Sequence, residues 1–113
     1  MSITALTGMV PEWFTPETEK GSDDPARFKL KPLDSKQMVE IQGYHKDGGI
    51  QAEGLYRAME LSIVEWENVN DIQGKPLKCN RNNIKTLPIE VIAECGAQAI
   101  SVSFLTDDEE KNL

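Results

Sequence analysis

Apolar residues recur every three or four positions between Gln51 and Trp66, with polar residues between them. This period predicts an amphipathic helix over about residues 50–66 that ends near Trp66. Leu61 and Val64 widen the apolar stripe, so we expect the helix to lie deep in the core. The stripe itself consists of Ala52, Leu55, Tyr56, Met59, Ile63 and Trp66.

A second stripe of the same period predicts another core helix over about residues 88–104. Pro88 suits its first turn, where a missing N–H does no harm. Gly96, Ala97 and Ala99 are small enough to let a neighbouring helix approach closely. The stripe consists of Ile89, Ile92, Ala93, Gly96, Ile100 and Phe104.

Over residues 26–33, apolar and polar residues alternate strictly instead of following the helical period. This alternation predicts a short, half-buried strand. Pro32 has no backbone N–H, so the strand either lies at a sheet edge or ends there. The polar side of the strand is basic, and it either pairs with nearby acidic residues or stays in solvent. Its residues are Arg27, Lys29 and Lys31, opposite Phe28 and Leu30.

Shorter elements connect these segments. Asp34 as an N-cap, with Gln37 completing a capping box, predicts a helix over about residues 35–42. Residues 67–79 form either a small β-hairpin or a compact loop with one or two short strands. Asn80 then caps a short helical turn.

Both ends of the chain are polar. Prolines and acidic residues predict an extended, flexible arm over residues 1–25. Trp13 and Phe14 interrupt this polarity, and they either fold back onto the core or dock on a partner. Residues 106–113 form an acidic tail or begin a last helix that Thr106 caps.

These patterns predict a mainly α fold in a chain of 113 residues, the usual size of one domain. A single helical domain is expected over residues 26–105, between the arm and the acidic tail. The β element is the strand at about 26–33, with a possible hairpin at about 67–79.

Composition limits the partners. The chain has 19 acidic and 12 basic side chains and a net charge of −7, so nucleic acid and anionic membranes would be repelled. No apolar run approaches the roughly 18 residues of a membrane span. The N-terminus also lacks a signal-peptide pattern. Cys79 and Cys95 need not pair, so we expect the reducing cytosol.

The sequence predicts no enzyme, no metal site and no cofactor. Its one histidine, His45, lies in a glycine-rich loop, and nucleophilic catalysis needs a base held beside the nucleophile. His45, Cys79 and Cys95 are too far apart for a zinc site, and the glycines lack the spacing of a phosphate-binding loop. Adjacent carboxylates occur only in the polar ends, at 23–24 and 107–110. A binding or assembly protein is therefore favoured.

Four segments follow one another along most of the chain. They are PEWFTP near the start, FKLKPL in the predicted strand, W-x-x-V-x-D-x-x-G-K-P-L from Trp66 to Leu77, and EKN at the end. The pair Leu87-Pro88 opens the last long helix. In that order the segments resemble the tail-assembly chaperones of long-tailed, non-contractile phages and prophages.

The resemblance implies a small, mainly helical viral protein that binds the tape-measure protein and recruits tail-tube subunits around it. It also implies a homo-oligomer that works in the host bacterial cytoplasm and is absent from the finished virion. A soluble acidic coat with aromatic anchors would shield a long, partly apolar tape-measure helix. We therefore expect an apolar groove and aromatic side chains to contact the partner, the candidates being Trp13, Phe14, Phe28 and Trp66.

The resemblance further implies a second, longer product, made by a programmed ribosomal frameshift of one base backwards near the end of the first frame. Lys111 as AAA and Asn112 as AAC, after a codon ending in A, would form the heptamer A-AAA-AAC. Both tRNAs can re-pair one base back on this heptamer. The codons are not visible in the protein, so the frameshift is a hypothesis.

One alternative belongs to a different class of protein, an acidic inhibitor or nucleic-acid-mimicking decoy of a host enzyme. The net charge of −7 favours it. Against it, the acidic residues are interleaved with lysines and gathered in the two ends, and they do not form a continuous phosphate-like track.

Overall fold

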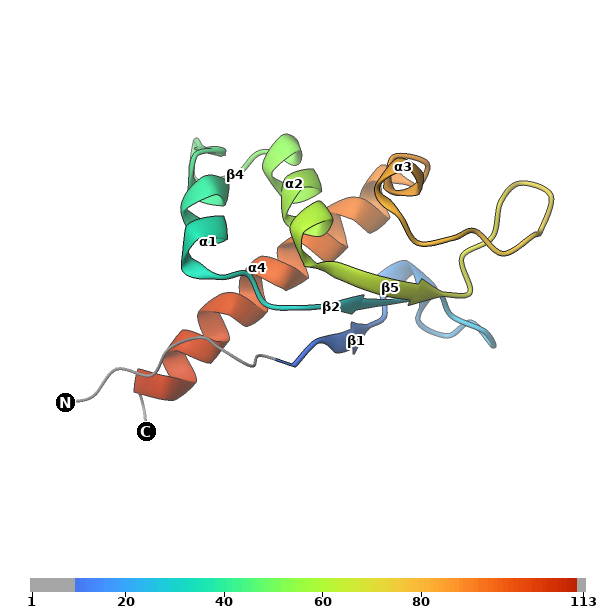
Figure 1. Ribbon diagram of the computed structural model, residues 1–113, viewed down its shortest axis with the longest axis horizontal. Helices are drawn as coiled ribbons and strands as arrows, with labels where there is room; N and C mark the ends of the chain where they lie inside the picture. Colours follow the sequence, from blue (N-terminus) through green and yellow to red (C-terminus); the bar gives the residue numbers. More distant parts are fainter. Residues whose placement is uncertain (1–9, 112–113) are drawn as a thin grey trace.

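A three-stranded antiparallel sheet joins segments that are far apart in the sequence. Its strands are β1 (Glu12–Phe14), β2 (Arg27–Leu30) and β5 (Ile63–Glu67), in the order β1-β2-β5 (Figure 1). The computed structural model describes the backbone of residues 10–111 and the side chains of residues 10–103. Since β2 lies between the other two strands, it is the centre of the sheet.

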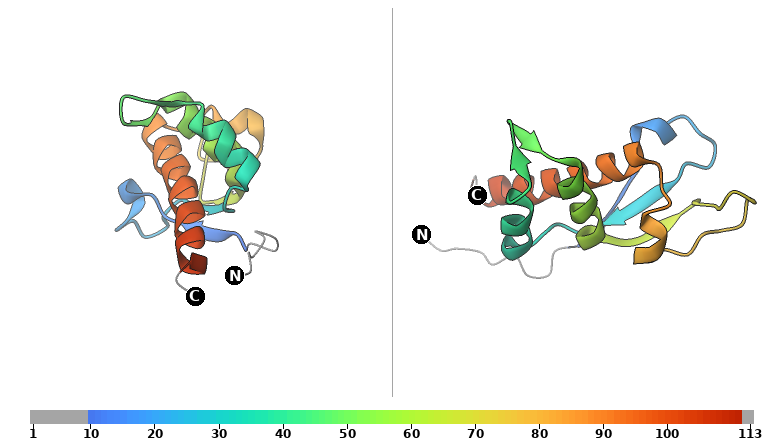
Figure 2. Two further views of the ribbon diagram at one scale, coloured as in Figure 1. Left: turned by 90° about the vertical axis from the view of Figure 1, so that its left-hand side faces the viewer. Right: turned by 90° about the horizontal axis from the view of Figure 1, so that it is seen from above.

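Helices pack beside this sheet. α4 packs along α2 and also reaches β2 (Figures 1 and 2). Among the described residues, none of the helices combines the length and hydropathy that a bilayer crossing requires. The helices are α1 (Ser35–Gln42), α2 (Ala52–Ser62), α3 (Arg81–Ile84) and α4 (Ile89–Lys111), with a 3-10 turn η1 (Glu17–Glu19).

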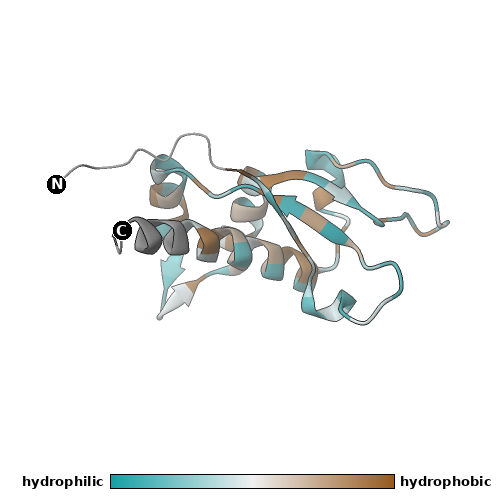
Figure 3. Ribbon diagram, turned by 90° about the horizontal axis from the view of Figure 1, so that it is seen from below, coloured by the Kyte–Doolittle hydropathy of each residue, from teal (hydrophilic) through white to brown (hydrophobic). Residues whose placement is uncertain are grey.

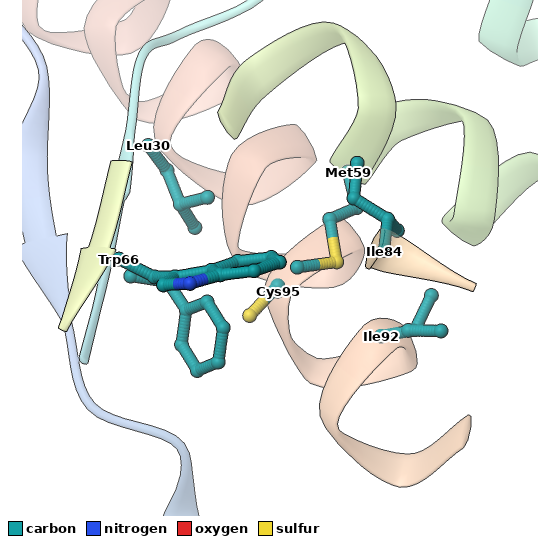
Figure 4. Packing of buried hydrophobic residues seen from close by; sticks show 7 residues of the cluster. Leu30, Met59, Trp66, Ile84, Ile92 and Cys95 are labelled. Carbon is teal, nitrogen blue, oxygen red and sulfur yellow. The ribbon is translucent and has the colours of Figure 1, made fainter. Parts of the chain in front are cut away.

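The main core lies between the inner face of the sheet and helices α2, α3 and α4. Figure 4 shows Trp66 reaching from β5 toward Met59 and Cys95. The rings of Trp66 and Phe28 meet edge to face, with centroids 6.1 Å apart and planes at 78°. The buried members of this cluster are Phe28, Leu30, Met59, Trp66, Ile84, Ile92 and Cys95.

The predicted start of α1 is confirmed. The Asp34 carboxylate accepts a hydrogen bond from the Gln37 N–H at 2.8 Å, and the Gln37 side-chain oxygen accepts one from the Asp34 N–H at 3.0 Å. This is the capping box that the sequence predicts. The Asn80 cap is confirmed too, because its side chain accepts a hydrogen bond from the Asn83 N–H at the start of α3.

A two-stranded hairpin joins α1 to α2. It pairs β3 (His45–Lys46) with β4 (Gly49–Ile50). Across the helix pair, Arg57 of α2 forms an ion pair with Glu40 of α1. The hydrogen bond from Arg57 lowers the pKa of the Glu40 carboxyl below its ordinary value.

The close approach of the two long helices is confirmed at Gly96. A Cβ atom there would lie 2.2 Å from the carbonyl oxygen of Leu55 on α2. Ala99, three residues further along α4, is fully buried. Ala97, which the sequence groups with them, is exposed to solvent.

The prediction of a mainly α fold is wrong, because the protein is a mixed α/β domain with two small sheets. The main error is at the end of the central helix. The sequence predicts a helix as far as Trp66, but α2 ends at Ser62 and residues 63–67 form β5. The backbone of Ile63 is already extended, at φ −66° and ψ 129°. Ile63 and Val64 are β-branched and therefore favour a strand, and β2 is the strand with which this segment pairs.

The predicted strand at 26–33 is confirmed in its centre and corrected at its end. β2 covers only Arg27–Leu30, and it is paired on both sides instead of lying at an edge. Pro32, which cannot donate to a ladder, follows directly after the last strand contacts. The predicted alternation along β2 is confirmed, because its residues are alternately half-buried and buried. In Figure 3 the strand shows bands of contrasting hydropathy.

Two other segments differ from expectation, and a third takes one of the two forms that the sequence left open. Residues 12–14, predicted in a flexible arm, are the strand β1 because they pair with β2. Residues 67–79, expected as a hairpin or a compact loop, form the loop, which one isolated bridge from Asn70 to Pro76 closes. α4 continues to Lys111 instead of ending near residue 104, since no glycine or proline interrupts the sequence between them.

Candidate partner-binding surface

The sheet register sorts the predicted aromatic residues onto two faces. Phe14 is opposite Phe28, and Phe28 is opposite Trp66, so these three rings form one row across the strands. Trp13 is opposite Lys29, which is opposite Glu65, and this neighbouring row points to the other face. The pairing therefore separates Trp13 from the other three aromatic residues.

The first row faces the core. Phe28 is 1% exposed and Trp66 is 9% exposed, while Phe14 is half-buried against the same cluster. The Trp66 indole N–H donates a hydrogen bond to the Leu77 carbonyl at 2.7 Å. In this conformation Phe28 and Trp66 have little surface with which to contact a partner, and Phe14 mainly attaches β1 to the core.

Trp13 lies on the opposite face and is 37% exposed. The guanidinium carbon of Arg27 is 5.0 Å from the centre of its ring, and the Lys29 ammonium nitrogen is 5.8 Å away. Such cation–π contacts contribute about 0.5–1 kcal/mol at exposed sites, enough to hold the indole in place. We call this face the outer sheet face; it consists of Trp13, Arg27, Lys29, Glu65 and Glu67.

The outer sheet face is held by contacts along its length. Arg27 forms an ion pair with Glu67 across the β2–β5 pair, with both side chains about two-fifths exposed. The side-chain amide of Asn68 donates a hydrogen bond to the Pro25 carbonyl at 3.0 Å. The ends of β2 and β5 are thereby fastened together beside the Trp13 ring.

The segment between β1 and β2 is also fixed to the domain. The Glu17 N–H donates a hydrogen bond to the Glu94 carboxylate of α4 at 2.8 Å. The Ala26 N–H donates one to the Glu19 carboxylate at 2.9 Å. Pro16 is fully buried. These contacts fix the position of β1, so Trp13 is presented on an ordered strand.

The other residues that the sequence considers for chemistry lie apart from this face. His45 is exposed on β3, while Cys79 is half-buried and Cys95 is buried, and both cysteines are free thiols. Burial raises the pKa of each thiol, that of Cys95 to about 12. Within the described part of the chain, no three His, Cys, Asp or Glu side chains are grouped to hold a metal ion.

The arrangement suits recognition of another protein. The exposed indole is in contact with an arginine, and tryptophan and arginine are two of the residue types that are enriched at protein interfaces. The sequence alone identifies Trp13 as a candidate but misses Glu65 and Glu67, because it places Glu65 on a helix and Glu67 in the loop or hairpin that follows. The signal that was available is the alternation of apolar and polar residues in Val64-Glu65-Trp66-Glu67.

No family model matches the chain, and neither the curated proteins nor the solved structures contain a significant match.

Proposed function

We propose that this protein is a tail-assembly chaperone of a long-tailed, non-contractile phage or prophage. It binds the tape-measure protein and helps to recruit tail-tube subunits. One observation supports this most: three segments that carry the resemblance converge in one sheet. PEWFTP contains β1, FKLKPL contains most of β2, and the run that starts at Trp66 begins on β5. Segments far apart in the sequence thus build one surface.

The outer sheet face is the proposed contact with the tape-measure protein. Trp13 supplies the exposed apolar anchor, and the charged groups around it suit the polar flank of an amphipathic helix. The proposed site of action is the host bacterial cytoplasm, where a net charge of −7 keeps the chaperone and its complex dispersed. The proposal requires no cofactor, nucleic acid or membrane.

The inhibitor alternative fits this surface less well. A nucleic-acid mimic needs a continuous track of negative charge, but Arg27 and Lys29 are interleaved with Glu65 and Glu67 on the outer sheet face. The acidic residues of the described chain are otherwise spread over several elements. We therefore favour the chaperone.

Co-expression with the tagged tape-measure protein of the same genome tests the proposal. We expect the wild-type chain to copurify with it, and Trp13→Ala to reduce the copurified amount roughly tenfold, as for a central aromatic anchor. Val39→Ala is the matched control, since Val39 is an exposed apolar residue of α1 outside the sheet. Phe14 is left intact because it packs against the core.

Two results would count against the proposal in different ways. If the wild-type chain retained neither tape-measure nor tail-tube protein, the chaperone function would be rejected. If the wild type and Trp13→Ala bound equally well, only the outer sheet face would be rejected as the contact.

Mass spectrometry of the product made from the native gene with its downstream DNA gives an independent test. We expect the 12.6 kDa protein together with a minor, longer protein that shares its N-terminus. Recoding Lys111 and Asn112 with synonymous codons should abolish the longer protein. A longer product that persisted after recoding would contradict the frameshift at this position.

A further inference from the structure

The connection between β5 and α4 is basic, although the protein as a whole is acidic. Residues 68–88 contain four basic side chains and one acidic side chain, a formal charge of +3, which leaves −10 for the remainder of a chain of net charge −7. We call residues 68–88 the basic end. Figure 1 shows its loop and the helix α3 at one end of the molecule. Its cations are Lys75, Lys78, Arg81 and Lys85.

The cations of the basic end are available to a partner. All four residues are exposed. Among the side chains of residues 10–103, none of the four forms an ion pair, whereas Lys20, Arg27 and Arg57 each pair with a glutamate. The carboxylates of a partner could therefore bind these cations without displacing an existing ion pair in this part of the chain.

The loop of the basic end is held by its own hydrogen bonds. The Asp71 carboxylate accepts hydrogen bonds from the Gln73 N–H at 2.9 Å and from the Lys75 N–H at 3.0 Å. At the base of the loop, the Leu77 N–H donates to the Val69 carbonyl at 2.8 Å. The one carboxylate of the basic end thus binds the backbone of its own loop.

The segment after the loop is also fixed. The Asn83 side-chain amide donates a hydrogen bond to the Lys78 carbonyl at 2.7 Å, and the Asn83 N–H donates one to the Asn80 side chain at 2.9 Å. Arg81 and Lys85 are four positions apart across α3 and its C-cap, so they lie on the same side of this turn. A partner therefore meets cations that an ordered backbone carries.

The loop also presents an apolar side chain to solvent. Ile72 is completely exposed, at 104% of the reference area. A large aliphatic side chain on an ordered loop loses little conformational entropy when it docks, so it can serve as an anchor. The basic end therefore combines an apolar anchor with unpaired cations, and its complement is a segment in which carboxylates flank an apolar residue.

The composition of the basic end favours a protein segment over a nucleic acid or a membrane. None of the aromatic residues of the chain lies within residues 68–88, so the basic end has no ring on which bases could stack. Three of its four cations are lysines, which lack the guanidinium fork that binds phosphate in two places. A long polyanion or an anionic bilayer would also extend over the remainder of the protein, whose charge of −10 repels it.

We infer that the basic end is a second binding surface, separate from the outer sheet face, and that its partner is an acidic segment of another protein. The carboxylates of that segment bind the four cations, and its apolar residue packs against Ile72. The inference goes beyond the proposed function, which places the tape-measure contact on the outer sheet face. It depends only on the charge and the exposure of the basic end.

Titration of the isotopically labelled full-length protein with a synthetic peptide, followed by two-dimensional NMR, tests the inference. The probe is a short peptide in which glutamates flank adjacent leucines. We expect saturable shifts in the amide signals of residues 68–88, with a Kd below about 1 mM, the weak end of specific affinities. Raising the salt concentration from about 0.05 M to about 0.5 M should weaken binding at least fivefold, because the charges are exposed and are screened by salt.

A charge variant and its matched control separate the site from the net charge. Lys75→Gln with Lys78→Gln should weaken peptide binding at least fivefold. Lys36→Gln with Lys46→Gln makes the same change in net charge at two exposed positions outside the basic end, and it should bind like the wild type. Equal weakening of the two variants would show that the peptide responds to net charge alone, and it would overturn the inference.

A second peptide, in which serines replace the leucines, tests the apolar contact. The wild type should bind it several-fold more weakly than the leucine peptide. Ile72→Ser should bind the two peptides equally, because it lacks the side chain against which the leucines pack. Val39→Ser, which changes an exposed aliphatic residue of α1, should distinguish the peptides as the wild type does.

Several other results would overturn the inference. They are a leucine peptide that does not bind below the stated limit, shifts that centre outside residues 68–88, and an Ile72→Ser protein that still distinguishes the two peptides. Tighter binding of a single-stranded oligothymidylate or of phosphatidylglycerol vesicles through the same cations would assign the basic end to nucleic acid or to a lipid surface. The assay contains no tape-measure protein, so it and the test of the chaperone function fail separately.

Discussion

Ser103 links two distant parts of the protein through one hydroxyl group. It accepts a hydrogen bond from the Leu33 N–H at 2.8 Å and donates one to the Ala99 carbonyl at 2.7 Å. Both Ser103 and Leu33 are buried, so water cannot replace the acceptor. This contact attaches the connection between β2 and α1 to the helix α4.

Removing that hydroxyl should destabilise the protein. Ser103→Ala leaves the buried Leu33 N–H without an acceptor, which costs about 1–3 kcal/mol. Urea denaturation measures the loss, and Ser101→Ala is the control because Ser101 is exposed on the same helix and gains the same helix propensity. Equal stability of the two variants would show that the hydroxyl is not needed.

Single residues were predictable where their partners are close in sequence. Asp34, Gln37 and Asn80 were identified as caps because a cap bonds to the backbone three residues away. The role of Ser103 was not predictable, because its partner Leu33 is 70 positions distant. The same limit applies to Trp13: a shift of one residue in the β1–β2 register would turn Phe14 outward in its place.

At the scale of elements, the contact between α2 and α4 depends on the missing side chain of Gly96. Gly96→Ala would place a methyl group 2.2 Å from the Leu55 carbonyl oxygen, so the helices must move apart. The better helix propensity of alanine adds up to about 1 kcal/mol to the free energy of unfolding. The cost of overpacking should exceed this gain, so we expect a net loss of stability of about 2 kcal/mol.

Thermal unfolding followed by circular dichroism measures this effect. Gly49→Ala is the matched control, because it adds the same methyl group on β4 where no atom lies within 4 Å. We expect a clear decrease in Tm for Gly96→Ala and a small change for Gly49→Ala. A Gly96→Ala protein as stable as the wild type would mean that the two helices are not in close contact in solution.

At the scale of the whole molecule, the reactivity of the two thiols reports on unfolding in different parts of the protein. Cys95 is fully buried in the main core, and Cys79 is half-buried in the loop before α3. Because the thiolate is the reactive form, and burial raises the pKa of Cys95 to about 12, the folded protein should protect Cys95 from alkylation. Iodoacetamide at pH 8 should modify Cys79 first and Cys95 only at the rate of global unfolding.

The raised pKa of Cys95 also predicts how stability depends on pH. Below the pKa of an unfolded thiol, about 8.5, both states keep the proton and burial of the thiol costs nothing extra. Above it the unfolded state loses the proton while the folded state keeps it, so stability should fall between that pKa and about 12. Comparing urea denaturation of the wild type and Cys95→Ala at pH 7 and 10 tests this, since the variant should show a smaller decrease.

The sequence by itself determined the features that arise within a few residues: the helical period of α4, the alternation in β2, the caps of α1 and α3, and the net charge of −7. Local sterics, capping hydrogen bonds and side-chain charge act over that range. Only the tertiary structure decided that residues 63–67 leave the helical period and form β5, and that Trp13 faces solvent while Phe14 faces the core. A strand becomes stable only when another part of the chain supplies its hydrogen bonds and its buried neighbours, and the fold alone brings that part into place.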